Sequence, residues 1–162
     1  MKRFSLVLLF AAALTAPAGA AGGGMDAMKY YVGSWTCMAG PTNDKPMSAT
    51  VEYTLNDSVL RQWVLVPAQG KMKTPYGLSI AYSWDAKAGR YVSAQTDNEG
   101  SWSVAYAKPW SGNTEEWVDH ANSGKLTRNT TVRDSQNAFH FMGYPSATST
   151  TANFKGTCKR AM

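Results

Sequence analysis

The stretch Tyr30-Tyr31-Val32-Gly33-Ser34-Trp35-Thr36-Cys37 lies near the start of a 162-residue chain and carries one of its two cysteines. The other, Cys158, lies near the C-terminus in Gly156-Thr157-Cys158-Lys159-Arg160. In a closed antiparallel barrel with an even number of strands, the first and last strands are antiparallel neighbours. If these two segments are those strands, the cysteines lie side by side. The pair therefore predicts a closed barrel that can be linked by a disulfide between Cys37 and Cys158.

The N-terminus has the pattern of a secretory signal peptide. A basic start, Met1-Lys2-Arg3, precedes an apolar run over residues 4–16 and an Ala-x-Ala site at Ala18-Gly19-Ala20. The apolar run is shorter than the roughly twenty residues of a membrane-spanning helix. We therefore predict a signal peptide over residues 1–20, a flexible leader over 21–25 and one domain over 26–162. The expected location is periplasmic or secreted, with no membrane insertion after cleavage.

The charge of the chain limits the classes of partner. The formal net charge is +5. Removal of Lys2 and Arg3 with the signal peptide leaves 14 basic and 11 acidic residues, a net charge of +3. No run of Lys or Arg forms a phosphate-binding track, so we expect no nucleic-acid partner.

Two cysteines in an oxidising compartment predict a single disulfide.

Residues between Trp35 and Cys158 alternate between apolar and polar side chains, with turn residues at short intervals. Leu78, Ile80, Tyr82 and Trp84, for example, would share one face of a strand. This spacing predicts an all-β fold: a single up-and-down antiparallel β-barrel of about ten strands. The residues from Met25 to Tyr31, before Val32, are expected to form a short helix that caps one end of the barrel. The last strand is expected over residues 148–158.

Gly33-x-Trp35 at the start of the chain and Lys159-Arg160 at its end resemble the calycin group. This group includes lipocalins, fatty-acid-binding proteins, avidins and nitrobindin-like barrels. The mature chain also resembles an exported bacterial family of unknown function that is placed near these barrels. The resemblance implies structural roles for Gly33 and Trp35, with Arg160, or in its place Lys159, lying over the Trp35 ring as in a cation–π contact.

The chain has six tryptophans and eight tyrosines, and several recur on one face of successive strands. In a barrel such residues point toward the axis. We take as candidates for a ligand-binding lumen Tyr53, Tyr82, Trp84, Trp102 and Tyr106. The function this implies is binding of a small apolar or amphiphilic molecule. In the alternative, these side chains fill the barrel, and it acts as a protein-interaction module similar to periplasmic inhibitors, with an unspecified protein partner.

A nitrobindin-like function would require a histidine in the lumen to bind haem iron. In Ala138-Phe139-His140-Phe141-Met142, the two phenylalanines alternate with His140, which predicts that His140 faces outward. His120 lies beside a turn. We therefore predict no haem, no other cofactor and no metal site.

The sequence lacks a Gly-x-Ser-x-Gly motif and paired metal-ligand motifs, so we expect no enzymatic activity. Glu115 and Asp119 are the best pair of carboxylates on one strand face. Our expectation for this pair is a solvated edge, with no catalytic role.

Overall fold

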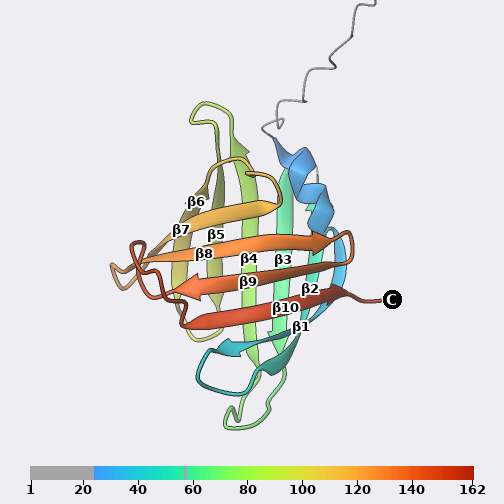
Figure 1. The fold of residues 1–162 in the computed structure, drawn as a ribbon, viewed down its shortest axis with the longest axis vertical. Helices are drawn as coiled ribbons and strands as arrows, with labels where there is room; N and C mark the ends of the chain where they lie inside the picture. The colour runs from blue at the N-terminus through green and yellow to red at the C-terminus, as the bar shows by residue number, and fades with distance from the viewer. Residues whose placement is uncertain (1–23, 57) are drawn as a thin grey trace, which may run out of the picture.

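The computed structural model describes residues 24–56 and 58–162, which form a closed barrel of ten antiparallel strands after one short 3-10 helix (Figure 1). The helix, η1, spans Met25–Tyr31. The strands are β1 (Gly33–Pro41), β2 (Met47–Asn56), β3 (Val59–Val66), β4 (Tyr76–Asp85), β5 (Arg90–Asp97), β6 (Trp102–Ala107), β7 (Thr114–Ala121), β8 (Leu126–Ser135), β9 (Ala138–Tyr144) and β10 (Phe154–Arg160). The predicted fold class is confirmed. The predicted signal peptide, and the leader up to residue 23, lie outside the described residues.

The strands follow one another around the barrel in chain order, and β10 pairs with β1 to close it. In that closing pair Cys37 lies opposite Cys158, and the two sulfur atoms are bonded at 1.99 Å. The disulfide therefore joins the two ends of the meander, as predicted. It is compatible with an oxidising compartment. Among the described residues, no helix is both long enough and apolar enough to cross a membrane.

The last strand is shorter than expected. It begins at Phe154, whereas the sequence pattern placed its start at residue 148. The preceding Ser- and Thr-rich segment makes local hydrogen bonds: Ser149 Oγ donates to the carbonyl of Thr151 at 2.9 Å. Such side-chain bonds to nearby backbone compete with strand pairing, and this explains the error.

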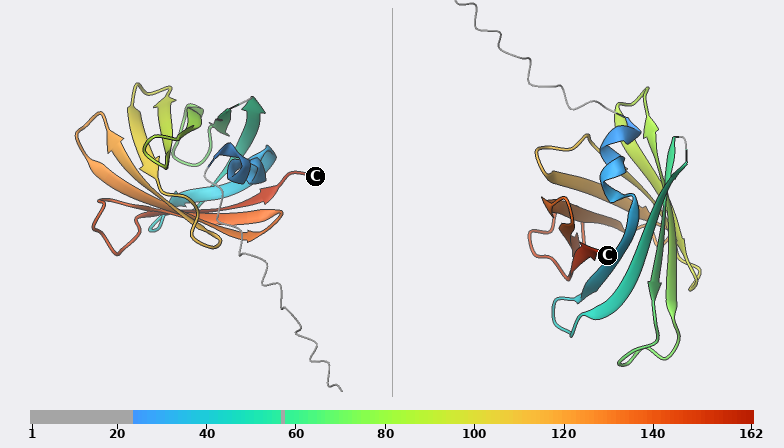
Figure 2. Two further views of the ribbon diagram at one scale, coloured as in Figure 1. Left: turned by 90° about the horizontal axis from the view of Figure 1, so that it is seen from above. Right: turned by 90° about the vertical axis from the view of Figure 1, so that its right-hand side faces the viewer.

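Helix η1 covers one end of the barrel (Figure 2). Met28 and Tyr31 are its buried residues. Two side chains from the barrel hold its backbone: Tyr91 donates to the carbonyl of Gly24 at 2.9 Å, and Arg133 donates to that of Ala27 at 2.7 Å. Aromatic rings pack against one another at this end of the barrel. Trp84, for example, lies edge-on to Tyr91 with ring centroids 4.9 Å apart.

Gly33, Trp35 and Arg160 form one cluster where η1 joins β1. The Arg160 guanidinium carbon lies 4.3 Å from the ring centre of Trp35, and Trp35 Nε1 donates to the Tyr31 carbonyl at 2.7 Å. Gly33 has φ of +122°, and a Cβ there would lie 2.9 Å from Arg160 Nη1. The glycine is therefore required both by the backbone conformation and by the approach of the guanidinium. Arg160, not Lys159, covers the ring.

Candidate functional site: the barrel cavity

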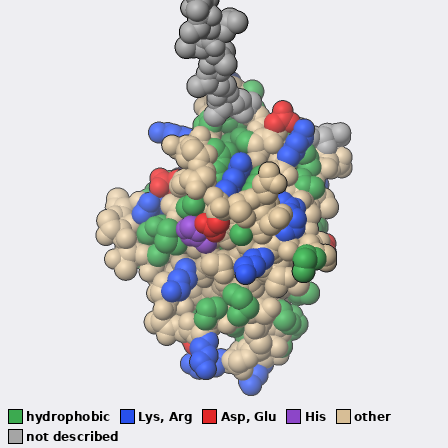
Figure 3. Space-filling model, turned by 45° about the vertical axis from the view of Figure 1, so that its right-hand side comes forward, with side chains coloured by type: hydrophobic (Ala, Val, Ile, Leu, Met, Phe, Trp, Pro, Cys, Tyr) green, Lys and Arg blue, Asp and Glu red, His purple; other side chains and the backbone are tan. Residues whose placement is uncertain are grey.

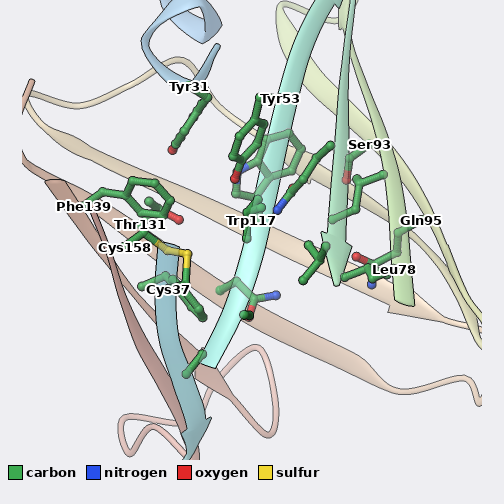
Figure 4. A pocket seen from close by; sticks show the side chains of 18 of the residues that line it. Tyr31, Cys37, Tyr53, Leu78, Ser93, Gln95, Trp117, Thr131, Phe139 and Cys158 are labelled. Carbon is green, nitrogen blue, oxygen red and sulfur yellow. A yellow bond between two sulfur atoms is a disulfide. The ribbon is translucent and has the colours of Figure 1, made fainter. Parts of the chain in front are cut away.

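A cavity of about 500 Å³ occupies the barrel from the inner side of η1 to the opposite end. Met28 and Tyr31 line it beneath the helix, and Met47, Met72 and Phe154 line it at the far end. Figure 4 shows Tyr31, Tyr53, Trp117 and Phe139 around the cavity, with the Cys37–Cys158 disulfide on its wall. Its size lies within the range of small-molecule binding sites, roughly 300–1,000 Å³.

The cavity exists because small side chains face inward on neighbouring strands. Ser93 on β5 and Ala105 on β6 lie opposite each other, are buried and line the cavity. Ala39 on β1 and Ala49 on β2 also line the cavity, and Ala49 is buried. Aromatic rings therefore crowd the helix end of the cavity, while small side chains leave space beyond them. Of the two alternatives drawn from the sequence, a packed and a hollow lumen, this volume favours the hollow one.

Of the five aromatic residues predicted to line the lumen, the structure places Tyr53 and Tyr82 in the cavity wall. Trp84 faces inward but packs against Tyr91 at the helix end, away from the cavity lining. The expectation that Trp102 and Tyr106 face the lumen is wrong. Trp102 is 53% exposed, and Tyr106 lies on the outer face under the guanidinium of Arg90.

The error on β6 has a clear cause. On this strand the small side chains are buried and the largest one is exposed. Ser103, Ala105 and Ala107 are buried, whereas Trp102 is exposed. Hydrophobic alternation ordinarily places the apolar face inside, but both faces of β6 carry apolar residues, so the pattern alone does not choose between them. The large residues were assigned to the core, although on this strand they lie on the outer surface.

Glu115 lies in the cavity wall, a position that the sequence did not predict. It was expected at a solvated edge, but it is 3% exposed and lines the cavity beside Trp117 of the same strand. Its Oε2 atom accepts a hydrogen bond from the Tyr31 hydroxyl at 2.9 Å. Its Oε1 atom is buried without a hydrogen-bond partner. Burial raises the pKa of Glu115 to about 7, against the opposing effect of the Trp117 and Tyr31 donors and of the Arg133 charge.

Asp119 also faces the cavity and is 8% exposed, which corrects the same expectation. Asn129 of the neighbouring strand β8 donates a hydrogen bond to its Oδ2 atom. Burial raises the pKa of Asp119, although the Asn129 hydrogen bond opposes this. About 13 Å of strand separates Asp119 from Glu115, at about 3.3 Å per residue. That spacing does not bring the two carboxyl groups to one reacting bond.

The tyrosines of the cavity are neutral hydrogen-bonding groups. Tyr31 stacks on Tyr53 with ring centroids 5.1 Å apart, and the Tyr82 hydroxyl donates to Gln62 Oε1. Burial raises the pKa of Tyr31, Tyr53 and Tyr82 above the ordinary value for a phenol. Each hydroxyl therefore keeps its proton at neutral pH.

Neither histidine lines the cavity. His140 Nδ1 lies 2.8 Å from Asp134 Oδ1, and the His120 ring packs edge-on against Tyr106 on the outer face. The two side chains therefore do not fit the role of an axial haem ligand in the lumen. Among residues 24–56 and 58–162, no three His, Cys, Asp or Glu side chains are grouped as a metal site would require. On the face shown in Figure 3, Lys and Arg side chains are dispersed.

Comparison with known proteins supports the fold alone. No protein-family model and no curated protein matches the sequence. Rv2717c from M. tuberculosis is similar in structure, with a TM-score of 0.57 and 12% identity over 85% of this chain and 97% of that one. A redesigned β-barrel matches with a TM-score of 0.44 and 13% identity, over 83% and 94% of the two chains.

Proposed function

We propose that this protein is an exported, non-enzymatic barrel that binds a small apolar or amphiphilic molecule in its lumen. The observation that carries the proposal is the cavity of about 500 Å³, whose lining is mostly apolar and aromatic with a few polar groups. Binding sites for small molecules have this character. The volume favours ligand binding over the alternative of a packed barrel that acts only through its outer surface.

The calycin resemblance and the predicted export belong to the same proposal. The Gly33, Trp35 and Arg160 cluster at the closed end has the arrangement that the resemblance implies. A disulfide suits a periplasmic or secreted protein. If export is correct, the protein purified from its source lacks residues 1–20, which intact mass measurement detects. An uncleaved protein would contradict the export proposal.

Ligand entry is tested by filling the cavity. Ala105 is 2% exposed and lines it, so Ala105→Leu would occupy part of the space. Ala94 of β5 is exposed on the outer face, which makes Ala94→Leu a matched control. An apolar naphthalene alcohol should raise the melting temperature of the unmodified protein further as its concentration rises, because it binds only the folded state.

We expect Ala105→Leu to weaken this binding by about tenfold or more, as loss of buried contact area predicts, and Ala94→Leu to leave it unchanged. If the alcohol binds equally well to both variants, the ligand does not occupy the lumen. If it does not bind the unmodified protein at all, the interaction-module alternative becomes the better one.

A further inference from the structure

The ionisable side chains that line the cavity are acids and phenols. Glu115 and Asp119 are its carboxyl groups, and among the described residues the lining includes no Lys, Arg or His. A cavity with two carboxyl groups and no basic partner is suited to a ligand that donates hydrogen bonds or carries positive charge. A fatty-acid head group would meet two carboxyl groups and no basic side chain in that lining.

Glu115 has one hydrogen-bonding position still free. Tyr31 satisfies its Oε2 atom. The neighbouring Trp117 N–H is close enough to lower the pKa of the carboxyl but does not form a hydrogen bond to Oε1, which is buried and unpartnered in a side chain that is 3% exposed. A buried acceptor without a partner is destabilising, and most such groups in proteins are satisfied. Thr131 lies directly opposite Glu115 on β8 and also lines the cavity. Glu115 therefore stands in the cavity wall, but Oε1 itself has almost no exposed surface, so a donor group on a ligand would reach it only with a shift of the surrounding side chains.

The nearest basic group does not occupy this position. Arg133 lowers the pKa of Glu115, but its Nη2 atom donates to the Ala27 carbonyl. Its guanidinium carbon also lies 3.5 Å from the ring centre of Trp110, and Arg133 is not part of the cavity lining. Its Nε atom is itself buried without a partner, so Arg133 forms no hydrogen bond to Oε1.

Aromatic rings surround the same part of the cavity. Tyr31 and Tyr53 are stacked, and Tyr82 lies edge-on to Trp117 with centroids 5.4 Å apart. All four line the cavity. The faces of aromatic rings attract cations, and tyrosine and tryptophan are the usual partners of ammonium groups in binding sites. Carboxyl and rings thus favour the same ligand chemistry.

We propose that the ligand of the lumen is an amine: a small apolar or aromatic molecule whose ammonium group is bound by Glu115 and the surrounding rings. Its apolar body would fill the hollow part of the barrel toward Met47 and Met72. This inference rests on the proposed function, because it names the ligand class for the same cavity. Glu115 would be the residue that determines specificity.

The test compares three probes built on one naphthalene ring: 1-naphthylmethylamine, 1-naphthalenemethanol and 1-naphthoate. Calorimetric titration at pH 8 keeps the amine protonated and Glu115 largely ionised. We expect the amine to bind at least about tenfold more tightly than the alcohol, the usual gain from a charged hydrogen bond, and the naphthoate to bind most weakly. In Glu115→Gln the amine should lose about tenfold or more in affinity, while the alcohol binds as before.

Glu116→Gln is the matched control, since Glu116 is the next residue on β7, is exposed and pairs with Arg128 on the outer face. It should preserve the preference for the amine. Unchanged alcohol binding also shows that each variant is folded. If naphthoate binds as tightly as the amine, or if Glu115→Gln loses no amine affinity, the amine proposal is wrong while lumen binding stands. If none of the three probes binds, both proposals are wrong.

Discussion

The Tyr31 hydroxyl, at the end of η1, donates a hydrogen bond of 2.9 Å to Glu115 Oε2 on β7. The contact links the helix that closes the barrel to the most buried acid of its wall. Because the other carboxylate oxygen has no partner, ionisation of Glu115 places a charge in a site that compensates only part of it. The stability of the fold should therefore depend on the state of this one group.

We predict that stability falls as the pH rises from about 4.5 to about 7. The pKa of Glu115 is about 7 in the folded protein, against 4.5 for an ordinary glutamate. The folded state therefore binds more protons than the unfolded state in this range, and the free energy of unfolding decreases with pH, by on the order of 3 kcal/mol. Urea unfolding at pH 4.5, 6 and 8, followed by tryptophan fluorescence, measures the slope.

Glu115→Gln should remove most of this pH dependence and make the protein more stable than the unmodified chain at pH 8. Asp119 contributes a slope of the same sign, since its pKa is also raised by burial. Glu116→Gln should leave the slope intact. Equal slopes in the unmodified chain and in Glu115→Gln would show that Glu115 is not the group responsible.

Trp35 and Arg160 should be energetically coupled. Trp35 is 1% exposed, so Trp35→Ala is expected to lower the free energy of unfolding by about 3–5 kcal/mol. Arg160 donates to the carbonyls of Val32 and Tyr30 at 2.7 and 2.9 Å, so Arg160→Ala should lower it by about 2–3 kcal/mol. A double-mutant cycle should give a coupling of about 1 kcal/mol or more. Lys159→Ala, an exposed neighbour, should change stability by less than about 0.5 kcal/mol. Additive effects would rule out a direct contact.

The disulfide should contribute strongly to stability because it joins residues 121 positions apart. For a loop of this length the chain-entropy model gives about 4–5 kcal/mol. When denatured without reduction, the protein should not be alkylated at Cys37 or Cys158. The double variant Cys37→Ala/Cys158→Ala should unfold at a lower urea concentration than the unmodified protein. Alkylation of both thiols before reduction is the contrary result.

Gly33→Ala should destabilise the protein by about 1–3 kcal/mol, because the residue has φ of +122° and its Cβ would press on Arg160. Gly40→Ala on the same strand is the control. Gly40 lies outside the left-handed region, and its nearest neighbour would be 3.4 Å away, so its replacement should have a smaller effect. Unfolding midpoints of the two variants provide the comparison. If Gly33→Ala is as mild as Gly40→Ala, the glycine is not required by this geometry.

The sequence by itself determined the architecture and its closure. Period-2 alternation between turn residues predicted ten strands, and the positions of Cys37 and Cys158 predicted that the first and last strands pair. These inferences succeed because they depend on local chain geometry and on the even strand number. The roles of Gly33, Trp35 and Arg160 came instead from the resemblance to the calycin group, which rests on a short motif at each end of the chain.

Only the tertiary structure decided which face of each strand lies inside. On β6 the inward residues are small, including Ala105, and the large Trp102 is outside. On β7 the inward set is Glu115, Trp117 and Asp119. Trp117, a large apolar residue between the two acids on the same face, was the signal in the sequence that this face points inward. On these two strands apolar residues lie on both faces, so the choice is made by the register of the neighbouring strands and by the space left inside the closed barrel.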